Sequence, residues 1–213
     1  GLLWNYNLNY FDYLNQEKLY DKDFKSLLDD FIDNYDNITF GRQPYPTSLR
    51  VINTIKYLAR KQMFESKYID FLHLEAEFLL NNLEYHLLAN HLLENLFSLW
   101  FSCHIFNDFK LHKKVSKLLL NELEEQVKTD GAHYELSPMY HQILLCRIFE
   151  CISLAKINNN SFSKSTTRVL NSKAEIMLGW LKEITNNYKY FIRINDSVEN
   201  IAPKLNTIKA FAK

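Results

Sequence analysis

The chain has 213 residues, of which 47% are hydrophobic, and its 25 Lys and Arg balance its 25 Asp and Glu. This hydrophobic content is enough for a sizeable core and argues against a disordered chain, and the zero net charge gives no support to a nucleic-acid binder, which should carry a basic surplus. Four Gly and four Pro are too few for a β-sandwich or barrel with many turns, and no apolar run reaches the roughly 18 residues of a membrane span.

The three cysteines, Cys103, Cys146 and Cys151, have neither the spacing of metal ligands nor that of a disulfide framework. We therefore expect them to be small buried side chains, and we predict no metal and no cofactor. The chain begins with Gly1 rather than Met, so the lack of a signal peptide says nothing about its compartment.

Apolar residues recur every three or four positions along most of the chain, which is typical of helices with one buried face. Phe24, Leu27, Leu28 and Phe31 illustrate this spacing near the start of the chain. In chain order, the expected helices cover residues 21–35, 47–64, 66–83, 90–107, 108–127, 138–157 and 166–185.

Helix-capping residues support two of these starts. Thr47 is expected to be the N-cap of the second helix, and Ser137 and Pro138 the N-cap and first residue of the sixth. Residues 188–204 break the helical period and should be extended or looped. No linker rich in Pro, Gly or Ser divides the chain, so the sequence predicts one all-α domain, residues 1–213, of stacked antiparallel helical hairpins.

Four polar clusters lie at or near the starts of alternate helices. They are "RQPYPTSLR" at 42–50, "EYHLLANH" at 84–91, "DGAHYELSPMYH" at 130–141, and "IRINDS" at 192–197, where an eighth helix would start. Because alternate helices in a series of hairpins run in the same direction, these clusters should share one end of the structure. Free N–H groups and the helix dipole would favour an anion there, so this pattern predicts a cleft.

In this order, the segments "WNYNLNYFDYL", "PYPTSLRVINTIKYL", "LLANHLLENLFSL", "ELEEQVKTDGAHYELSPMYHQILL" and "NDSVENIAP" resemble the heparinase II/III family of bacterial polysaccharide lyases. The resemblance covers nearly the whole chain, and "DGxHxELSPxYH" is its most specific part. It implies an incomplete (α/α) toroid that is the N-terminal part of a larger enzyme, in which a C-terminal β-sandwich domain follows. A bacterial, periplasmic or secreted protein is expected, with a cytoplasmic location left open.

The resemblance also implies an activity, which is cleavage of a uronic-acid-containing polysaccharide by β-elimination. By motif, Asn90 and Tyr140 match the family's catalytic Asn and Tyr, whereas the family's catalytic His belongs to the β-sandwich and has no counterpart here. The neutral amide of Asn90 suits stabilisation of charge that develops on the uronate carboxylate. Tyr140 would act as base or acid; as a base it needs a lowered pKa, which nearby cations and helix N-termini would provide.

Seven further residues are predicted to bind the acidic polysaccharide: His91, His133, Glu135, His141, Arg50, Asn195 and Asp196. The three histidines could instead orient Tyr140. Each prediction has a structural alternative: Asn90 as a helix cap, Tyr140 as a packed ring, and Arg50 as the partner of a carboxylate.

Two other functions stay open from the sequence. One is a glycan-binding or structural helical domain without catalysis. The other is an (α/α) glycoside hydrolase, which needs two carboxylates about 5–10 Å apart; Glu135 and Asp196 are the obvious pair.

Overall fold

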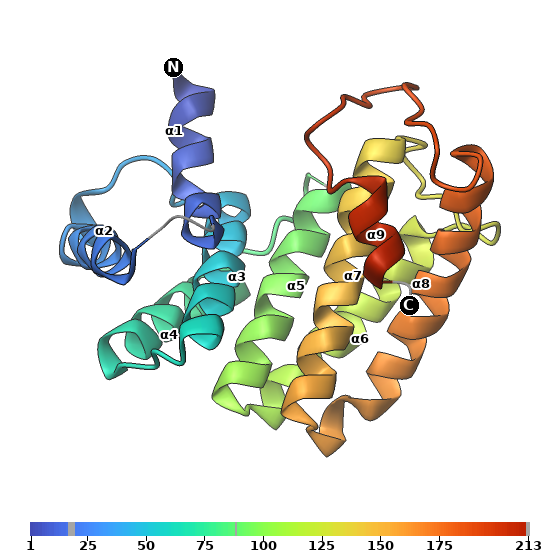
Figure 1. The fold of residues 1–213 in the computed structure, drawn as a ribbon. Coiled ribbons are helices and arrows are strands. Elements are labelled where there is room, and N and C mark those ends of the chain that lie inside the picture. Colours follow the sequence, from blue (N-terminus) through green and yellow to red (C-terminus); the bar gives the residue numbers. More distant parts are fainter. Residues whose placement is uncertain (17–19, 88, 212–213) are drawn as a thin grey trace. The chain divides into compact units, whose positions relative to one another are not determined.

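The computed structural model describes residues 1–16, 20–87 and 89–211. This part of the chain contains no strand, and its residues pack into two compact units, Gly1–Phe106 and Asn107–Lys213. Unit 1 contains α1 (Leu2–Asn9), α2 (Asp21–Asp33), α3 (Pro44–Lys61), α4 (Ser66–Asn81) and α5 (Ala89–Phe106), and unit 2 contains α6 (Phe109–Gln126), α7 (Pro138–Asn158), α8 (Lys164–Ile184) and α9 (Leu205–Phe211) (Figure 1).

All seven predicted helices are present, each longer than ten residues. Ser137 is the N-cap of α7, where its hydroxyl accepts a hydrogen bond from the Tyr140 N–H, and Pro138 is the first helical residue, as predicted. Residues 188–204 form no helix or strand. The short helices α1 and α9 were not predicted, and α9 begins at Leu205 rather than beside Asn195.

The predicted start of the second helix is wrong. Thr47 is not an N-cap, because α3 begins three residues earlier at Pro44, with Gln43 in the cap position. Proline is favoured in a first helical turn, where an N–H group would have no intrahelical acceptor. Two of the first three residues of α3 are prolines, so this helix end offers few N–H groups to an anion.

Unit 1 is organised around α3, which packs against α1, α4 and α5. Its core includes a stacked pair of rings, Phe24 and Tyr57, with centroids 3.7 Å apart. The amide of Asn95 in α5 donates to the Ser48 hydroxyl of α3 at 3.0 Å, close to the N-terminal ends of both helices. The two helices therefore run in the same direction, as expected for alternate members of a series of hairpins.

In unit 2, α7 packs against α8 and α9, and α6 packs against α8 (Figure 1). Leu145 and Ile148 of α7 and Leu170 and Leu181 of α8 are completely buried. The three cysteines are buried, as predicted. Among the described helices, none is long and apolar enough to cross a membrane.

Candidate active site

In unit 1, the candidate residues Asn90 and His91 lie in the first turn of α5. Asn90 is half-buried and lies inside the helix, so it is not the N-cap that the structural alternative required. The His91 ring lies against the ring of Tyr45 from the first turn of α3, with centroids 4.5 Å apart. The polar clusters at 42–50 and 84–91 therefore meet, as predicted.

A buried carboxylate holds the His91 ring. Nδ1 of His91 lies 3.5 Å from Oε1 of Glu84, which is 7% exposed while the histidine side chain is 38% exposed. The amide of Asn95 in turn donates to Oε2 of Glu84 at 3.0 Å, and its carbonyl oxygen accepts from the Glu84 N–H at 3.0 Å. Contact with a carboxylate favours a proton on Nδ1, which leaves Nε2 of His91 as the nitrogen that can accept a hydrogen bond from a ligand.

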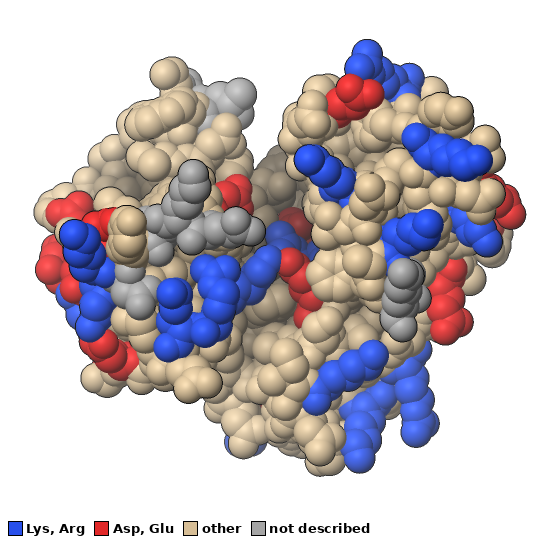
Figure 2. All heavy atoms as spheres, viewed as in Figure 1, with Lys and Arg blue, Asp and Glu red and all other residues tan. Residues whose placement is uncertain are grey.

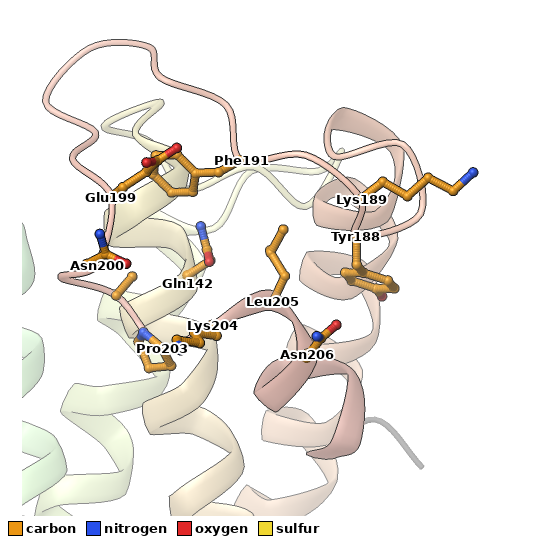
Figure 3. Close-up of a pocket in the computed structure, with 11 residues that line it drawn as sticks. Gln142, Tyr188, Lys189, Phe191, Glu199, Asn200, Pro203, Lys204, Leu205 and Asn206 are labelled. Carbon is orange, nitrogen blue, oxygen red and sulfur yellow. The ribbon is translucent and has the colours of Figure 1, made fainter.

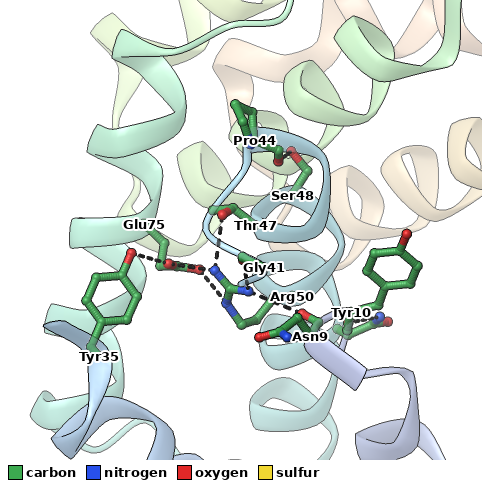
Figure 4. Close-up of polar contacts among 10 residues, drawn as sticks. Asn9, Tyr10, Tyr35, Gly41, Pro44, Thr47, Ser48, Arg50 and Glu75 are labelled. Atoms are coloured by element: carbon green, nitrogen blue, oxygen red, sulfur yellow. Dashed lines mark hydrogen bonds and ion pairs between the residues drawn. The ribbon is translucent and has the colours of Figure 1, made fainter. Parts of the chain in front are cut away.

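Arg50 is not available to a substrate, so its prediction as a substrate-binding residue is wrong. Its side chain is completely buried, and its five N–H groups are all used (Figure 4). Nε and Nη2 donate to Glu75 at 2.7 and 2.9 Å, and Nη2 also donates to Thr47 at 3.1 Å. Nη1 donates to the carbonyl oxygens of Gly41 and Asn9 at 2.8 and 3.2 Å.

This buried ion pair joins separate segments of unit 1. Oε1 of Glu75 also accepts a hydrogen bond from the Tyr35 hydroxyl at 2.6 Å, and the guanidinium lies 4.8 Å from the centre of the Phe31 ring. Burial, followed by the charge of Glu75, raises the pKa of Tyr35 well above its ordinary value. The alternative in which Arg50 pairs with a carboxylate is therefore the correct one.

In unit 2, the segment 130–137 folds back on the end of α6 and then starts α7. The N–H of Tyr134 donates to Gln126 O at 2.8 Å, and the N–H of Lys128 donates to Ala132 O at 2.9 Å. Gly131 makes this turn with φ +91°, and a Cβ atom at this position would lie 2.2 Å from the Ile176 carbonyl oxygen of α8. Only glycine fits such a backbone without strain.

Two histidines are structural, His133 in this segment and His141 in α7, which corrects their prediction as substrate ligands. His133 is 1% exposed, with Nε2 3.2 Å from Gln126 Oε1, and His141 is completely buried, with Nε2 3.0 Å from Met177 O. Burial lowers the pKa of His133 to about 4 and that of His141 to about 3. Both rings are therefore neutral at pH 7; His133 fixes the segment to α6, and His141 fixes the start of α7 to α8.

Tyr140 lies in the first turn of α7 and is half-buried. Burial, then the charges of Glu135 and Asp196, raise its pKa above the ordinary value. The cations that were expected to lower this pKa are not among the causes of the shift, so that expectation is wrong. Since its hydroxyl keeps its proton at neutral pH, Tyr140 suits the role of acid and not that of base.

The loop that contains Asn195 and Asp196 lies against the segment 130–137, as predicted for these two clusters. The Asn195 amide donates to the carbonyl oxygens of Leu136 and Glu135 at 2.9 and 3.4 Å. The Ser197 hydroxyl lies 3.0 Å from that of Ser137 and accepts from the Met139 N–H at 3.3 Å. Asn195 is thus a tether for the loop, whereas Asp196 is exposed beside Tyr140.

Sequence reasoning missed Glu84, Asn95 and Ser197, which position the candidate residues. Glu84 and Asn95 do fall inside the motifs around Asn90, but their burial depends on α3, which residue spacing does not show. Among the described residues, no group of three or more His, Cys, Asp or Glu could hold a metal ion. The face drawn in Figure 2 carries side chains of both signs on each unit, in line with zero net charge.

Comparison with known proteins agrees with the resemblance in the sequence. Residues 48–209 match the family model described as "Heparinase II/III N-terminus", while no curated protein matches the chain. A crystal structure of heparinase III superposes with a TM-score of 0.65 at 18% identity, and the match covers 87% of this chain and 32% of the heparinase III chain. A heparinase III gene product with methylated lysines superposes with a TM-score of 0.53 at 21% identity, covering 87% and 33%.

These two matches confirm the predicted fold class, which is all-α of the (α/α) toroid type. The chain spans about a third of the length of the heparinase III structures. With the family model matching residues 48–209, the chain belongs to the heparinase II/III N-terminal domain family.

Proposed function

We propose that this chain is the helical part of a polysaccharide lyase that cleaves a uronic-acid-containing glycan by β-elimination. The observation that carries the proposal is the state of Tyr140, which is partly exposed in the first turn of α7, with its N–H bonded to the N-cap Ser137 and with a raised pKa that keeps its hydroxyl protonated at neutral pH. Family membership provides the lyase context.

The reaction needs a base, an acid and a group that stabilises negative charge. A base removes the proton at C5 of the uronate, the electron pair forms the C4=C5 double bond, and the C4–O bond breaks. Tyr140 gives its proton to the departing oxygen, and the amide of Asn90 donates a hydrogen bond to the uronate carboxylate as charge develops there. The proposal assigns the base to the histidine of a following β-sandwich domain, as the family resemblance implies.

His91 is assigned to substrate binding beside Asn90. Its Nδ1 is occupied by Glu84, so Nε2 can accept a hydrogen bond from a sugar hydroxyl. The neighbouring Tyr45 ring is half-buried, and an aromatic ring of this kind suits contact with the apolar face of a sugar.

The test compares Asn90→Ala and Tyr140→Phe with the wild-type full-length protein on a panel of uronate polymers. Formation of unsaturated uronate is followed by ultraviolet absorbance, at matched concentrations of folded protein. Loss of an oxyanion-type donor should lower turnover by about 10²–10³-fold. Tyr140→Phe keeps the ring and its packing but removes the hydroxyl, so it should also lose most of the activity. Turnover within about threefold of wild type for both variants would refute the proposal.

A glycoside hydrolase is the second candidate. It is favoured by one observation: the bonds from Asn195 bring the loop of Asp196 against the segment of Glu135, where both carboxylates contribute to the raised pKa of Tyr140. A hydrolase releases reducing ends without the absorbance of an unsaturated uronate, so measuring both products separates the two reactions. If the protein binds the polymers and releases neither product, the third reading, a glycan-binding domain, replaces both.

A further inference from the structure

Unit 2 contains a pocket of about 320 Å³ between the start of α7 and the loop that joins α8 to α9 (Figure 3). Its wall contains Gln142 from α7, Tyr188 and Phe191 from the loop, and Lys204, Leu205 and Asn206 at the start of α9. None of these residues takes part in the proposed elimination. The volume is at the lower end of the range for small-molecule sites, which suits one sugar residue and not a long segment.

The loop that lines the pocket turns sharply at several residues. Asn187, Tyr188 and Asn200 have φ angles of 58°, 64° and 67°, which turn the chain sharply without forming a helix or strand. Asn tolerates this left-handed conformation better than most residues. Asn195 and Ser197 bind the middle of this loop to the segment 130–137, and a loop that is tethered before a ligand arrives loses less entropy on binding.

Gln142 provides a buried polar group to this pocket. The side chain is 2% exposed and lines the pocket, and its Nε2 donates to Pro138 O at 3.0 Å. Figure 3 shows the amide directed toward the space between Asn200 and Leu205. With the nitrogen held in this way, the carbonyl oxygen is oriented to accept a hydrogen bond from a ligand.

The remaining polar groups favour an anion over a cation. Lys189 and Lys204 are exposed lysines in the pocket wall, and Figure 3 shows Lys189 extending away from the pocket. Glu199 contributes one negative charge, but its carboxylate is paired with Arg193 at 2.7 Å. Lys204 is therefore the cation that an anionic ligand would meet, while the Tyr188 and Phe191 rings can contact the apolar face of a sugar.

We propose that this pocket is a subsite for one uronate residue of the acidic glycan, with Gln142 accepting from a sugar hydroxyl and Lys204 binding the carboxylate. The choice of a uronate as the ligand rests on the proposed function, but binding in this pocket can be measured whether or not the protein cleaves the glycan. A repeating polymer presents further uronates along its length, so a second uronate can bind here while another reacts.

Binding is measured on the full chain by NMR titration with tetrasaccharides from three uronate polymers, namely polyglucuronate, heparosan and alginate. A neutral cello-tetraose and inorganic sulfate serve as the other probes. At least one uronate tetrasaccharide should shift the amide resonances of Gln142 and Asn206 and bind roughly tenfold more weakly to Lys204→Ala, because a charge-assisted hydrogen bond is lost. The matched control is Lys209→Ala, since Lys209 is an exposed lysine of α9, five residues after Lys204, that does not line the pocket.

The proposal is overturned if no uronate tetrasaccharide binds, if Lys204→Ala binds as well as Lys209→Ala, or if cello-tetraose binds equally well. Equal affinity for inorganic sulfate would also overturn it, because that would show an unspecific anion site. Thermal unfolding of both variants checks that each is folded. If the full-length protein forms unsaturated product but Lys204→Ala binds the tetrasaccharides like wild type, only the subsite is refuted. If a uronate tetrasaccharide binds here but the full-length protein releases no unsaturated product from any uronate polymer, only the lyase is refuted.

Discussion

The buried Arg50–Glu75 pair predicts a large loss of stability when one partner is removed. Arg50→Met leaves the Glu75 carboxylate completely buried with the Tyr35 hydroxyl still donating to it. Removing one member of a buried ion pair costs about 3–5 kcal/mol, because the other charge is left without compensation. Since whole domains are stable by about 5–15 kcal/mol, this single change should bring unit 1 close to unfolding.

The double variant Arg50→Met/Glu75→Met separates the charge from the other contacts. It removes the lone carboxylate, so it should be more stable than Arg50→Met. It should not reach wild type, because the carbonyl oxygens of Gly41 and Asn9 lose their donor, and each unsatisfied buried group costs about 1–3 kcal/mol.

The assay is urea unfolding followed by circular dichroism, with Lys25→Met as the control. Lys25 pairs with Glu65 at 2.6 Å, but both side chains are at least 40% exposed, so little change is expected. If Arg50→Met unfolds within about 1 kcal/mol of wild type while polysaccharide binding is lost, the structural role is refuted and Arg50 returns to the substrate site.

Three further predictions concern unit 2. His141 is neutral when folded, with a pKa of about 3, but takes up a proton near pH 6.5 when unfolded. Between these two pH values the unfolded state therefore binds more protons than the folded state. The free energy of unfolding should be highest above about pH 6.5 and should fall as the pH is lowered, with His141 alone accounting for a loss of about 2 kcal/mol at pH 5. Urea midpoints measured from pH 7.5 to 5 should fall less steeply for His141→Gln, and an equal slope would contradict the assignment. Gly131→Ala should destabilise the protein by a few kcal/mol, about the cost of strain and overlap, because its Cβ would overlap α8. Gly179→Ala, in an open helical position, should stabilise the protein by about 0.5–1 kcal/mol. Thermal unfolding compares the two variants, and equal melting temperatures would be inconsistent with a close approach of Gly131 to α8. Because the pKa of Tyr140 is raised, an acid at this position stays protonated to above about pH 10, so the alkaline loss of kcat/KM should lie above that pH. A loss centred near pH 8 in a folded enzyme would exclude Tyr140 as the acid.

The helices could be predicted because an amphipathic period is a local property of the sequence. The cap at Ser137 is local too, and it was found. Thr47 has the same local signal, but the prolines before it start α3 one turn earlier. The helices α1 and α9 are seven or eight residues long, too short for a period to be visible.

The candidate site was predicted less well, because the residues that contact its side chains are distant from them in the sequence. Arg50 of α3 pairs with Glu75 of α4, and His141 is bonded to the carbonyl oxygen of a residue 36 positions later. A main-chain acceptor has no signature in residue type, so the sequence could not show that His141 is structural. The partner of His133 is the side chain of Gln126, seven residues earlier, and the two meet only because the segment 130–137 folds back on α6. Asn195 was placed correctly beside the segment 130–137, but as a tether between loops.

The contact between the segment 130–141 and α8 has a consequence for how the sequence of this protein can diverge. Gly131 closely approaches the carbonyl oxygen of Ile176, and His141 bonds that of Met177, so both contacts end on main-chain atoms. Any residue that keeps α8 helical provides the same two oxygens. Mutations at Ile176, which is 37% exposed, can therefore accumulate without disturbing the loop, whereas a mutation at Gly131 or His141 directly disturbs one of the two contacts. Divergent relatives should keep this glycine and histidine opposite an α8 whose sequence has drifted.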